Sequence, residues 1–211
     1  MEFKAFSKIA RLNRDIVVTE KLDGTNAQVF ICNAETLQNS CAGGNADFVQ
    51  DFVSEYCLAE KDGLYMFAGS RTRWITLGKE KDNAGFAFWV KEHADELFQL
   101  GEGGHYGEWY GRGIQRGYGL DHKRFALFNV ARWSIDPSLK PKCVELVPLL
   151  YVGPFNETKI KEVLADLKLN GSRAVPFLNP EGIVIYHTAS KTLYKVTLEN
   201  DEKPKGAVNE S

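Results

Sequence analysis

A lysine stands two residues before an Asp-Gly pair in the stretch VVTEKLDGTNAQVFI, residues 17–31. Asp23 and Gly24 lie between two apolar, β-like runs and predict a β-hairpin, because glycine tolerates the positive φ that a tight turn needs. On that interpretation Lys21 is a solvated residue at a strand end. A lysine fixed beside a turn can also act as a nucleophile when a nearby cation or partial burial favours its neutral form. The short pattern alone leaves both interpretations open.

Charged side chains in otherwise apolar or aromatic segments mark further places where chemistry could occur. Glu108 lies in the aromatic stretch HYGEWYG, where strand alternation alone favours an exposed carboxylate over one in a pocket. Glu181 belongs to a Pro-Glu-Gly turn that enters an apolar, buried strand. Lys195 interrupts another apolar strand, and a lysine in such a place needs a partner or a ligand.

Positive charge gathers near a tryptophan in GSRTRWITLGKEKD, residues 69–82. Cations beside an aromatic ring suit a nucleic-acid backbone and its bases, although each residue could equally belong to a solvated loop. Trp74 in this stretch and Trp109 are candidate exposed aromatics for base stacking. The cations of the stretch are Arg71, Arg73, Lys79 and Lys81.

Other common nucleotide and metal motifs are excluded by their spacing. The stretch GRGIQRGYG, residues 111–119, spaces its glycines G-x-G-x-x-x-G with no helical pattern behind it, which argues against a dinucleotide-binding loop. The four histidines have no ligand-like spacing. The four cysteines form neither a C-x-x-C pair nor a disulfide framework, as is usual in a reducing compartment.

The length and charge of the chain indicate one globular domain. The chain has 211 residues and a formal net charge of −2, so any site for a polyanion must be a local cluster. We expect a domain over residues 1–200 and a flexible polar tail over 201–211. The sequence has no apolar run long enough to span a bilayer and no signal-peptide core, which predicts a cytoplasmic protein without a membrane partner.

The periodicity of apolar residues predicts an α+β domain of antiparallel sheets flanked by helices. Helices are expected over 46–60, 85–100 and 157–169, the last with Asn156 as its N-cap and Gly171 at its end. Strands outnumber helices and few are linked by crossover helices, so a doubly wound parallel sheet is not expected. The expected strands cover residues 14–20, 26–32, 64–68, 105–110, 125–133, 144–151, 182–187 and 192–198.

The order of the charged motifs resembles that of the covalent nucleotidyltransferases, which include ATP-dependent RNA and DNA ligases and mRNA capping enzymes. The motifs follow one another as E-K-L-D-G-T-N, S-R, Y-G-E-W-Y-G, F-A-L-F-N, E-G-I-V-I and L-Y-K-V-T. The forms of the first and third motifs look most like those of phage-type RNA ligases. The resemblance covers about residues 17–200 and implies a nucleotidyltransferase (adenylation) domain of the ligase type.

The resemblance implies catalytic roles for three residues. Lys21 would be the nucleophile that takes AMP from ATP, and Lys195 would hold the α-phosphate. Glu181 would take part in catalysis by engaging the metal ion, Mg²⁺ or Mn²⁺.

Four further residues would bind the nucleotide. Glu20 would help shape the adenine pocket, and Arg71 would contact phosphate. Glu108 would hold the ribose hydroxyl, and Phe128 would stack on adenine.

The function implied is that of an ATP-dependent RNA ligase, which seals 5′-phosphate and 3′-hydroxyl ends through a lysyl-AMP intermediate. RNA is the expected partner rather than DNA, and a phage or viral origin would fit. A minimal ATP-dependent DNA ligase, a guanylyltransferase that uses GTP, and a non-catalytic nucleotide- or nucleic-acid-binding domain of the same fold are the alternatives.

Three departures from the family pattern limit the comparison. Asn129 follows Phe128 where aspartate is usual, and Lys195 is alone where two lysines are usual. Only a short polar tail follows the last motif, so we expect that a partner protein could supply the accessory domain of the larger relatives.

Overall fold

The computed structural model describes residues 8–40, 46–78, 80–134, 136–199 and 201. The chain divides into two compact units, and each is described by itself. Unit 1 comprises residues 1–22 and 148–211, and unit 2 comprises residues 23–147. Most of the predicted polar tail lies outside the described residues. No helix in the described ranges is long and apolar enough to cross a membrane.

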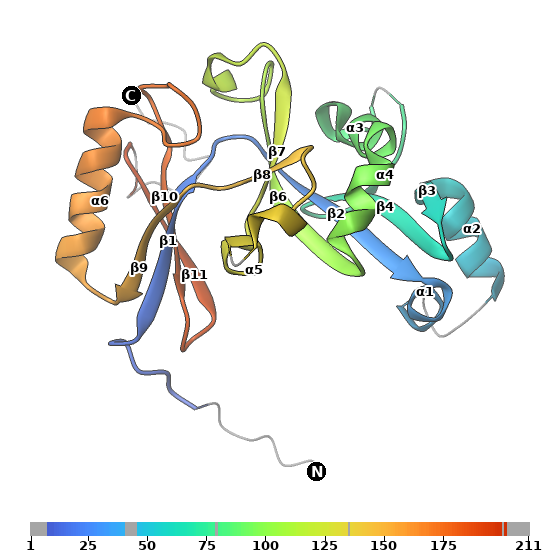
Figure 1. Ribbon diagram of the computed structural model, residues 1–211, viewed down its shortest axis with the longest axis horizontal. Coiled ribbons are helices and arrows are strands. Elements are labelled where there is room, and N and C mark those ends of the chain that lie inside the picture. Colours follow the sequence, from blue (N-terminus) through green and yellow to red (C-terminus); the bar gives the residue numbers. More distant parts are fainter. Residues whose placement is uncertain (1–7, 41–45, 79, 135, 200, 202–211) are drawn as a thin grey trace, which may run out of the picture. The chain divides into compact units, whose positions relative to one another are not determined.

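Unit 1 is a four-stranded antiparallel sheet with one helix, α6 (Glu157–Asn170), packed against it (Figure 1). The helix begins and ends as predicted. The Asn156 side chain accepts a hydrogen bond from the Lys159 N–H at 3.1 Å, and Gly171 follows the helix with a φ of 81°. The strands lie in the order β11 (Thr192–Thr197), β10 (Gly182–His187), β1 (Asp15–Lys21) and β9 (Leu149–Pro154).

Alternation along β1 and β10 decides which face of the unit 1 sheet is covered. Every second residue of these strands packs against α6, and Ile16, Val18, Ile183 and Ile185 form the core with residues of the helix. The residues between them, including Lys21, therefore point to the opposite face of the sheet.

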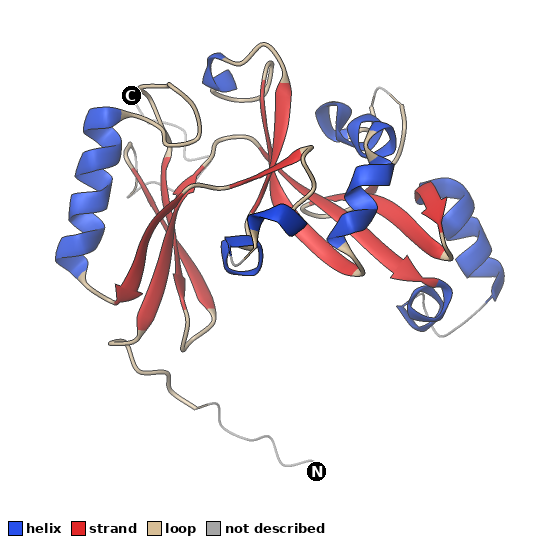
Figure 2. Cartoon of the chain, in the orientation of Figure 1, coloured by secondary structure: helices blue, strands red, loops and turns tan. Residues whose placement is uncertain are grey.

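Unit 2 is built on a larger sheet with helices on both faces (Figure 2). Its neighbouring strands are antiparallel except for the parallel pair β7 and β8. The order is β3 (Cys57–Lys61), β4 (Leu64–Ser70), β2 (Thr25–Asn33), β6 (Gly103–Gly111), β7 (Lys123–Leu127) and β8 (Val144–Leu146), with β5 (Trp74–Ile75) paired to β4.

The two faces of the unit 2 sheet have different cores. One face of β2, with Ala27, Val29 and Ile31, packs against α3 (Phe86–Glu92) and α4 (Ala94–Leu97). The other face meets α1 (Ala34–Ser40) and α2 (Ala46–Tyr56) in a cluster that contains Cys32, Leu37 and Phe67. The remaining helical segments are α5 (Val130–Ser134) and the 3₁₀ turns Asn83–Gly85, Phe98–Leu100, Gly117–Gly119 and Pro137–Leu139.

The predicted α+β class with antiparallel sheets is confirmed, but several element ends were wrong. The helix expected over 46–60 stops at Tyr56, because the next residues pair with β4 as strand β3. The helix expected over 85–100 is interrupted at His93. The strand expected over 125–133 ends at Leu127, after which the chain forms α5.

The predicted hairpin at Asp23-Gly24 is also wrong. Strand β1 pairs with β9 and β10, whereas β2 pairs with β4 and β6, so the two strands belong to different sheets. Gly24 is not among the glycines with a positive φ. Glycine is required there for space, because a Cβ atom would lie 2.3 Å from the Trp109 carbonyl oxygen.

Candidate active site

The predicted site residues fall into two groups. Unit 1 holds Glu20, Lys21, Glu181 and Lys195. Unit 2 holds Arg71, Glu108 and Phe128.

Lys21 and Glu181 form an ion pair in unit 1. In the register of β1 with β10, Lys21 lies opposite Gly182, the residue that follows Glu181. The Lys21 Nζ atom is 2.6 Å from Glu181 Oε2, and the two side chains are 20% and 6% exposed. The sheet therefore joins two motifs that are 160 residues apart in sequence.

Lys195 lies on the same face of this sheet as Lys21. It is opposite Val184, which in turn is opposite Thr19, and residues that alternate along a strand or face each other across strands share one face. Lys195 was expected to need a partner or a ligand in its apolar strand, but β11 is an edge strand and the Lys195 side chain is exposed. Because the Lys195 ammonium is exposed to solvent, it needs no protein partner, and the side chain can reach a ligand.

Glu20 points to the opposite face from Lys21 and is almost completely buried. Its Oε2 accepts a hydrogen bond from the Arg173 N–H at 2.7 Å. Burial raises the pKa of this carboxyl, while hydrogen bonds from Ser172, Arg173 and Ala174 act in the other direction. Oε1 is buried and has no hydrogen-bond partner among the residues that the structure describes. A ligand that donates an N–H or O–H to Oε1 would satisfy this oxygen.

Glu108 fixes the segment that follows the lysine motif in unit 2. Its Oε1 accepts from the Gly24 N–H and its Oε2 accepts from the Asn26 side-chain amide, both at 3.0 Å. Glu108 is 7% exposed, so the surface position favoured by strand alternation is wrong. Alternation fails here because β6 is buried on both faces from Gly107 to Gly111.

Arg71 and Phe128 follow the ends of two other strands of the unit 2 sheet. Arg71 is exposed and comes directly after Ser70, which pairs with Ala27. The Phe128 N–H donates to the Tyr106 carbonyl, which extends the pairing of β6 with β7 by one residue. Phe128 is 42% exposed and therefore presents an aromatic ring that a base could stack on.

The Asn129 departure has a local explanation. Its side-chain oxygen accepts a hydrogen bond from the Arg132 N–H at 3.1 Å, at the start of α5. Asparagine and aspartate are comparable at helix N-termini, so this capping contact survives the change.

The model of the RNA ligase family matches residues 14–197 of the chain. The chain belongs to the RNA ligase family. This confirms the resemblance to covalent nucleotidyltransferases that the motif order indicated. No curated protein sequence matches the chain.

Solved structures of an RNA ligase from Naegleria gruberi share the fold. A mutant with ATP and manganese matches with a TM-score of 0.55 and 20% identity over 88% of this chain and 50% of that chain. A second mutant, with AMP and manganese, matches with a TM-score of 0.56 and 19% identity over the same shares of the two chains. The enzyme with pyrophosphate matches with a TM-score of 0.55 and 19% identity. The chain thus spans about half the length of these ligase structures.

The motifs of this RNA ligase family member do not include the residues that hold Asp23. Arg116 Nε donates to Asp23 Oδ2 at 3.0 Å, and the Tyr118 hydroxyl accepts from the Asp23 N–H at 2.9 Å. Both side chains come from the glycine-rich stretch 111–119. Its glycines could have indicated a tightly bent loop, since Gly111, Gly113, Gly117 and Gly119 all have positive φ.

Neither of the two tryptophans expected to be exposed for base stacking is an exposed residue. Trp109 is 2% exposed, and Trp74 packs against Phe30 and Phe52 with ring centroids 5.6 and 5.7 Å apart. The expectation that the basic stretch 69–82 forms a binding surface has better support. Trp74 lines a hollow of about 360 Å³ together with Tyr56 and the cations Arg73 and Lys81. Lys79 lies outside the described residues.

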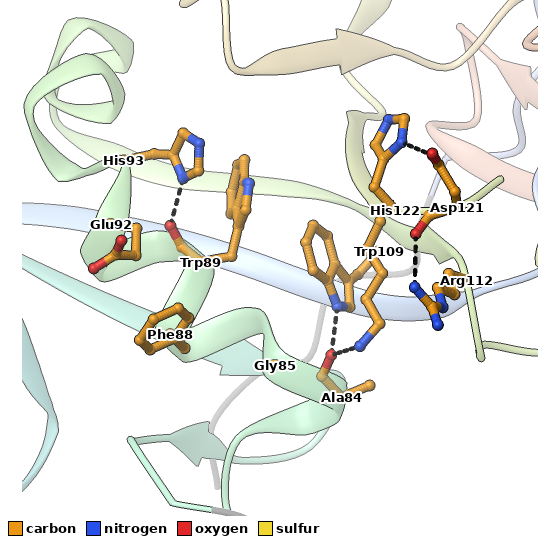
Figure 3. A pocket seen from close by; sticks show the side chains of 11 residues that line it. Ala84, Gly85, Phe88, Trp89, Glu92, His93, Trp109, Arg112, Asp121 and His122 are labelled. Carbon is orange, nitrogen blue, oxygen red and sulfur yellow. Dashed lines mark hydrogen bonds and ion pairs between the residues drawn. The ribbon is translucent and has the colours of Figure 1, made fainter.

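A larger hollow, of about 510 Å³, lies elsewhere on unit 2 and contains none of the predicted site residues (Figure 3). The Ala84 carbonyl at its base accepts hydrogen bonds from Trp109 Nε1 at 3.1 Å and from Lys123 Nζ at 2.7 Å. The Trp89 and His93 rings stack at 4.8 Å on its wall. Acidic and basic side chains both line this hollow, so its charge does not select a ligand.

Glu181 fits a metal ion that arrives with a nucleotide. Within the described ranges, no group of three histidine, cysteine, aspartate or glutamate residues is placed to form a protein-only metal site. Mg²⁺ in nucleotide enzymes is commonly held by one or two carboxylates together with substrate phosphates. A single buried carboxylate beside Lys21 meets that requirement.

We expect Glu108 and Asn26 to be coupled in stability. Glu108→Gln should lower the free energy of unfolding by about 1–3 kcal/mol, because two amide groups would then face each other. Asn26→Asp should have a similar cost, because two carboxylates would face each other. The double variant should recover part of the loss, since an amide could again donate to a carboxylate. Urea denaturation measures all four proteins, and strictly additive losses would contradict the contact.

Proposed function

We propose that the chain is an ATP-dependent RNA ligase for RNA repair, with residues 1–200 as its adenylation domain and Lys21 as the site of lysyl-AMP formation. The observation that carries the proposal is the 2.6 Å contact between Lys21 Nζ and the buried Glu181 carboxylate. These residues occupy the two motifs to which the family resemblance assigns the nucleophile and the metal ligand. We place the activity in the cytoplasm, where ATP and RNA meet.

The first step would be attack by the neutral Lys21 amine on the α-phosphorus of ATP. A nitrogen–phosphorus bond forms, the bond from the α-phosphorus to the bridging oxygen breaks, and pyrophosphate leaves. The Lys21 ammonium would release a proton to solvent and leave the Glu181 ion pair before the amine attacks, so that the carboxylate could turn to an incoming cation. Bound Mg²⁺ or Mn²⁺ would offset the charge of the triphosphate and of the leaving pyrophosphate.

The other unit 1 residues suit this nucleotide. Lys195 is exposed on the face that carries Lys21 and would hold the α-phosphate. Glu20 would help shape the adenine pocket, as the family resemblance implies, while its buried carboxylate on the opposite face of the sheet holds the Arg173 backbone.

In unit 2, Glu108 would bind the ribose, since a carboxylate oxygen can accept more than one hydrogen bond. Phe128 would stack on adenine, and Arg71 would contact phosphate. Exposure of the last two side chains supports these roles.

Two further steps would complete sealing. AMP moves from Lys21 to a 5′-phosphate end, and a 3′-hydroxyl then attacks that phosphate and displaces AMP. Arg71, Arg73 and Lys81 would contact the RNA backbone. Because the chain has a formal net charge of −2, we expect modest, salt-sensitive RNA affinity and further contacts from a partner protein.

We expect wild-type protein to acquire an AMP adduct from labelled ATP, and Lys21→Ala to acquire none. Lys21→Arg is the matched control, because it keeps a cation opposite Glu181 yet lacks a nucleophilic amine at neutral pH. Mass spectrometry should find the adduct on Lys21, and the label should be acid-labile and alkali-stable. Equal labelling of either variant would refute the assignment, and labelling by GTP alone would identify a guanylyltransferase.

We expect Lys195→Ala to slow adenylation on the order of 100-fold, as is typical when one preorganised charge is removed from a site. The unfolding free energy should be unchanged, because the side chain is exposed. Lys168→Ala is the control, since it removes the same charge from an exposed position of α6. Single-turnover kinetics compare the three proteins, and a wild-type rate for Lys195→Ala would exclude Lys195 from the site.

We expect pre-adenylated substrates with a ribose 3′-end to be sealed faster than matched substrates with a deoxyribose 3′-end. A 2′-hydroxyl next to the attacking oxygen offers a contact that DNA lacks. The measurement is a single-turnover comparison in which only the two terminal nucleotides of the 3′-hydroxyl strand differ. Equal rates, or a faster deoxy end, would support a minimal DNA ligase instead.

A further inference from the structure

The segment Asp23–Asn26 is held by three separate parts of unit 2. Glu108 on β6 binds Gly24 and Asn26, as described above. In the turn before α3, Asn83 Oδ1 accepts from Thr25 Oγ1 at 3.2 Å, and its side-chain amide donates to the Asn26 carbonyl at 3.3 Å. The loop of residues 111–119 holds Asp23.

This loop is shaped to bring two side chains back to Asp23. Its four glycines, together with Gln115 and Tyr118, adopt positive φ and fold the chain sharply after β6. Tyr118 is 2% exposed and packs edge-on against Tyr110 with a centroid distance of 5.4 Å, so its hydroxyl is held in place. Arg116 reaches the Asp23 carboxylate from the same loop.

The negative charge of Asp23 links its ion pair with Arg116 to the proposed reaction. Two residues of extended chain span at most about 7 Å, so Asp23 cannot be far from Lys21 along the backbone. An unpaired carboxylate there would repel the triphosphate of ATP. The Arg116 and Asp23 side chains are only 22% and 16% exposed, so solvent screens their attraction less than that of a surface pair.

We infer that Arg116 is a positioning residue for lysine adenylation, which acts by fixing and neutralising the Asp23 carboxylate while Tyr118 fixes the Asp23 backbone. The inference rests on the proposed function, because its catalytic consequence requires that Lys21 accept AMP. It assigns a role to the glycine-rich stretch whose spacing is wrong for a dinucleotide-binding loop.

A double-mutant cycle tests whether Arg116 acts through Asp23. The variants are Arg116→Met, which keeps most of the aliphatic stem, Asp23→Asn, and their combination. We expect Arg116→Met to lower the single-turnover adenylation rate at saturating ATP by about 10- to 100-fold, as small misplacements at reacting centres do. In the Asp23→Asn background, Arg116→Met should have little further effect, because the partner charge is already gone. Arg116→Lys should recover part of the rate.

Two controls separate positioning from loss of structure. Lys61→Ala removes the cation of the exposed Lys61–Asp95 pair in the same unit and should leave the rate unchanged. Hydrogen exchange of the Arg116→Met protein should be faster in the peptide that contains Asp23–Asn26, with other peptides protected as in wild type.

A wild-type rate for Arg116→Met, additive losses in the cycle, or unchanged exchange at Asp23–Asn26 would each overturn the inference while the proposed function stands. A wild-type protein that takes up no nucleotide would overturn the proposed function, and with it the role of Arg116 in adenylation. In that case, faster exchange at Asp23–Asn26 in Arg116→Met would still show that Arg116 holds this segment. The proposed function would then have failed although the Asp23 contact exists.

Discussion

The antiparallel pairing of β1 with β10 is the constraint on which the unit 1 site depends. It closes a separation of 160 residues by main-chain hydrogen bonds and leaves the Lys21 and Glu181 side chains in contact. Gly182 makes the next pairing possible, because a Cβ atom there would lie 2.2 Å from the Val196 carbonyl oxygen of β11. The approach of β11 in turn places Lys195 on the face that carries Lys21. One sheet register therefore positions three of the predicted site residues.

Two different kinds of interaction position the residues of the first motif. Its lysine ends a strand and is placed by sheet register, whereas the residues that follow it are placed by side chains. Glu108 is suited to this second task, since a nearly buried carboxylate needs donors and receives them from Gly24 and Asn26. The same two contacts, one to the backbone and one to a side chain, hold the segment that follows Lys21. Glu108 thus serves the structure before any nucleotide is bound, which explains why a carboxylate is suited to this aromatic strand.

Residue types at fixed order were enough to predict the family, the α+β class and the ends of α6, because these depend on local patterns. Three errors share another cause, which is contact between segments distant in sequence. Gly24 matched a hairpin signal, but its small size serves packing against β6. The charged residues next to Trp74 in sequence suggested an exposed side chain, but Trp74 packs in an aromatic cluster with residues of β2 and α2. Residues 57–60 continued a helical pattern, but pairing with β4 makes them a strand. Similarly, the contact of Arg116 with Asp23 joins residues that are 93 positions apart, and no local pattern predicts it.

Asn129 and Lys195 depart from the family pattern, and in both cases the chain can meet the same physical requirement in another way. Asn129 supplies the side-chain oxygen at the start of α5 that aspartate would supply, and only the charge is lost. Lys195 is the only lysine of the last motif, and it is exposed on the face of the sheet that carries Lys21. If the chain binds ATP as we propose, the negative charge of the triphosphate would be offset by fewer protein cations on this face. Under the proposed function, neutralisation of Asp23 by Arg116 would reduce that demand, because Asp23 is only two residues from Lys21 along the chain and its charge would otherwise oppose that of the triphosphate.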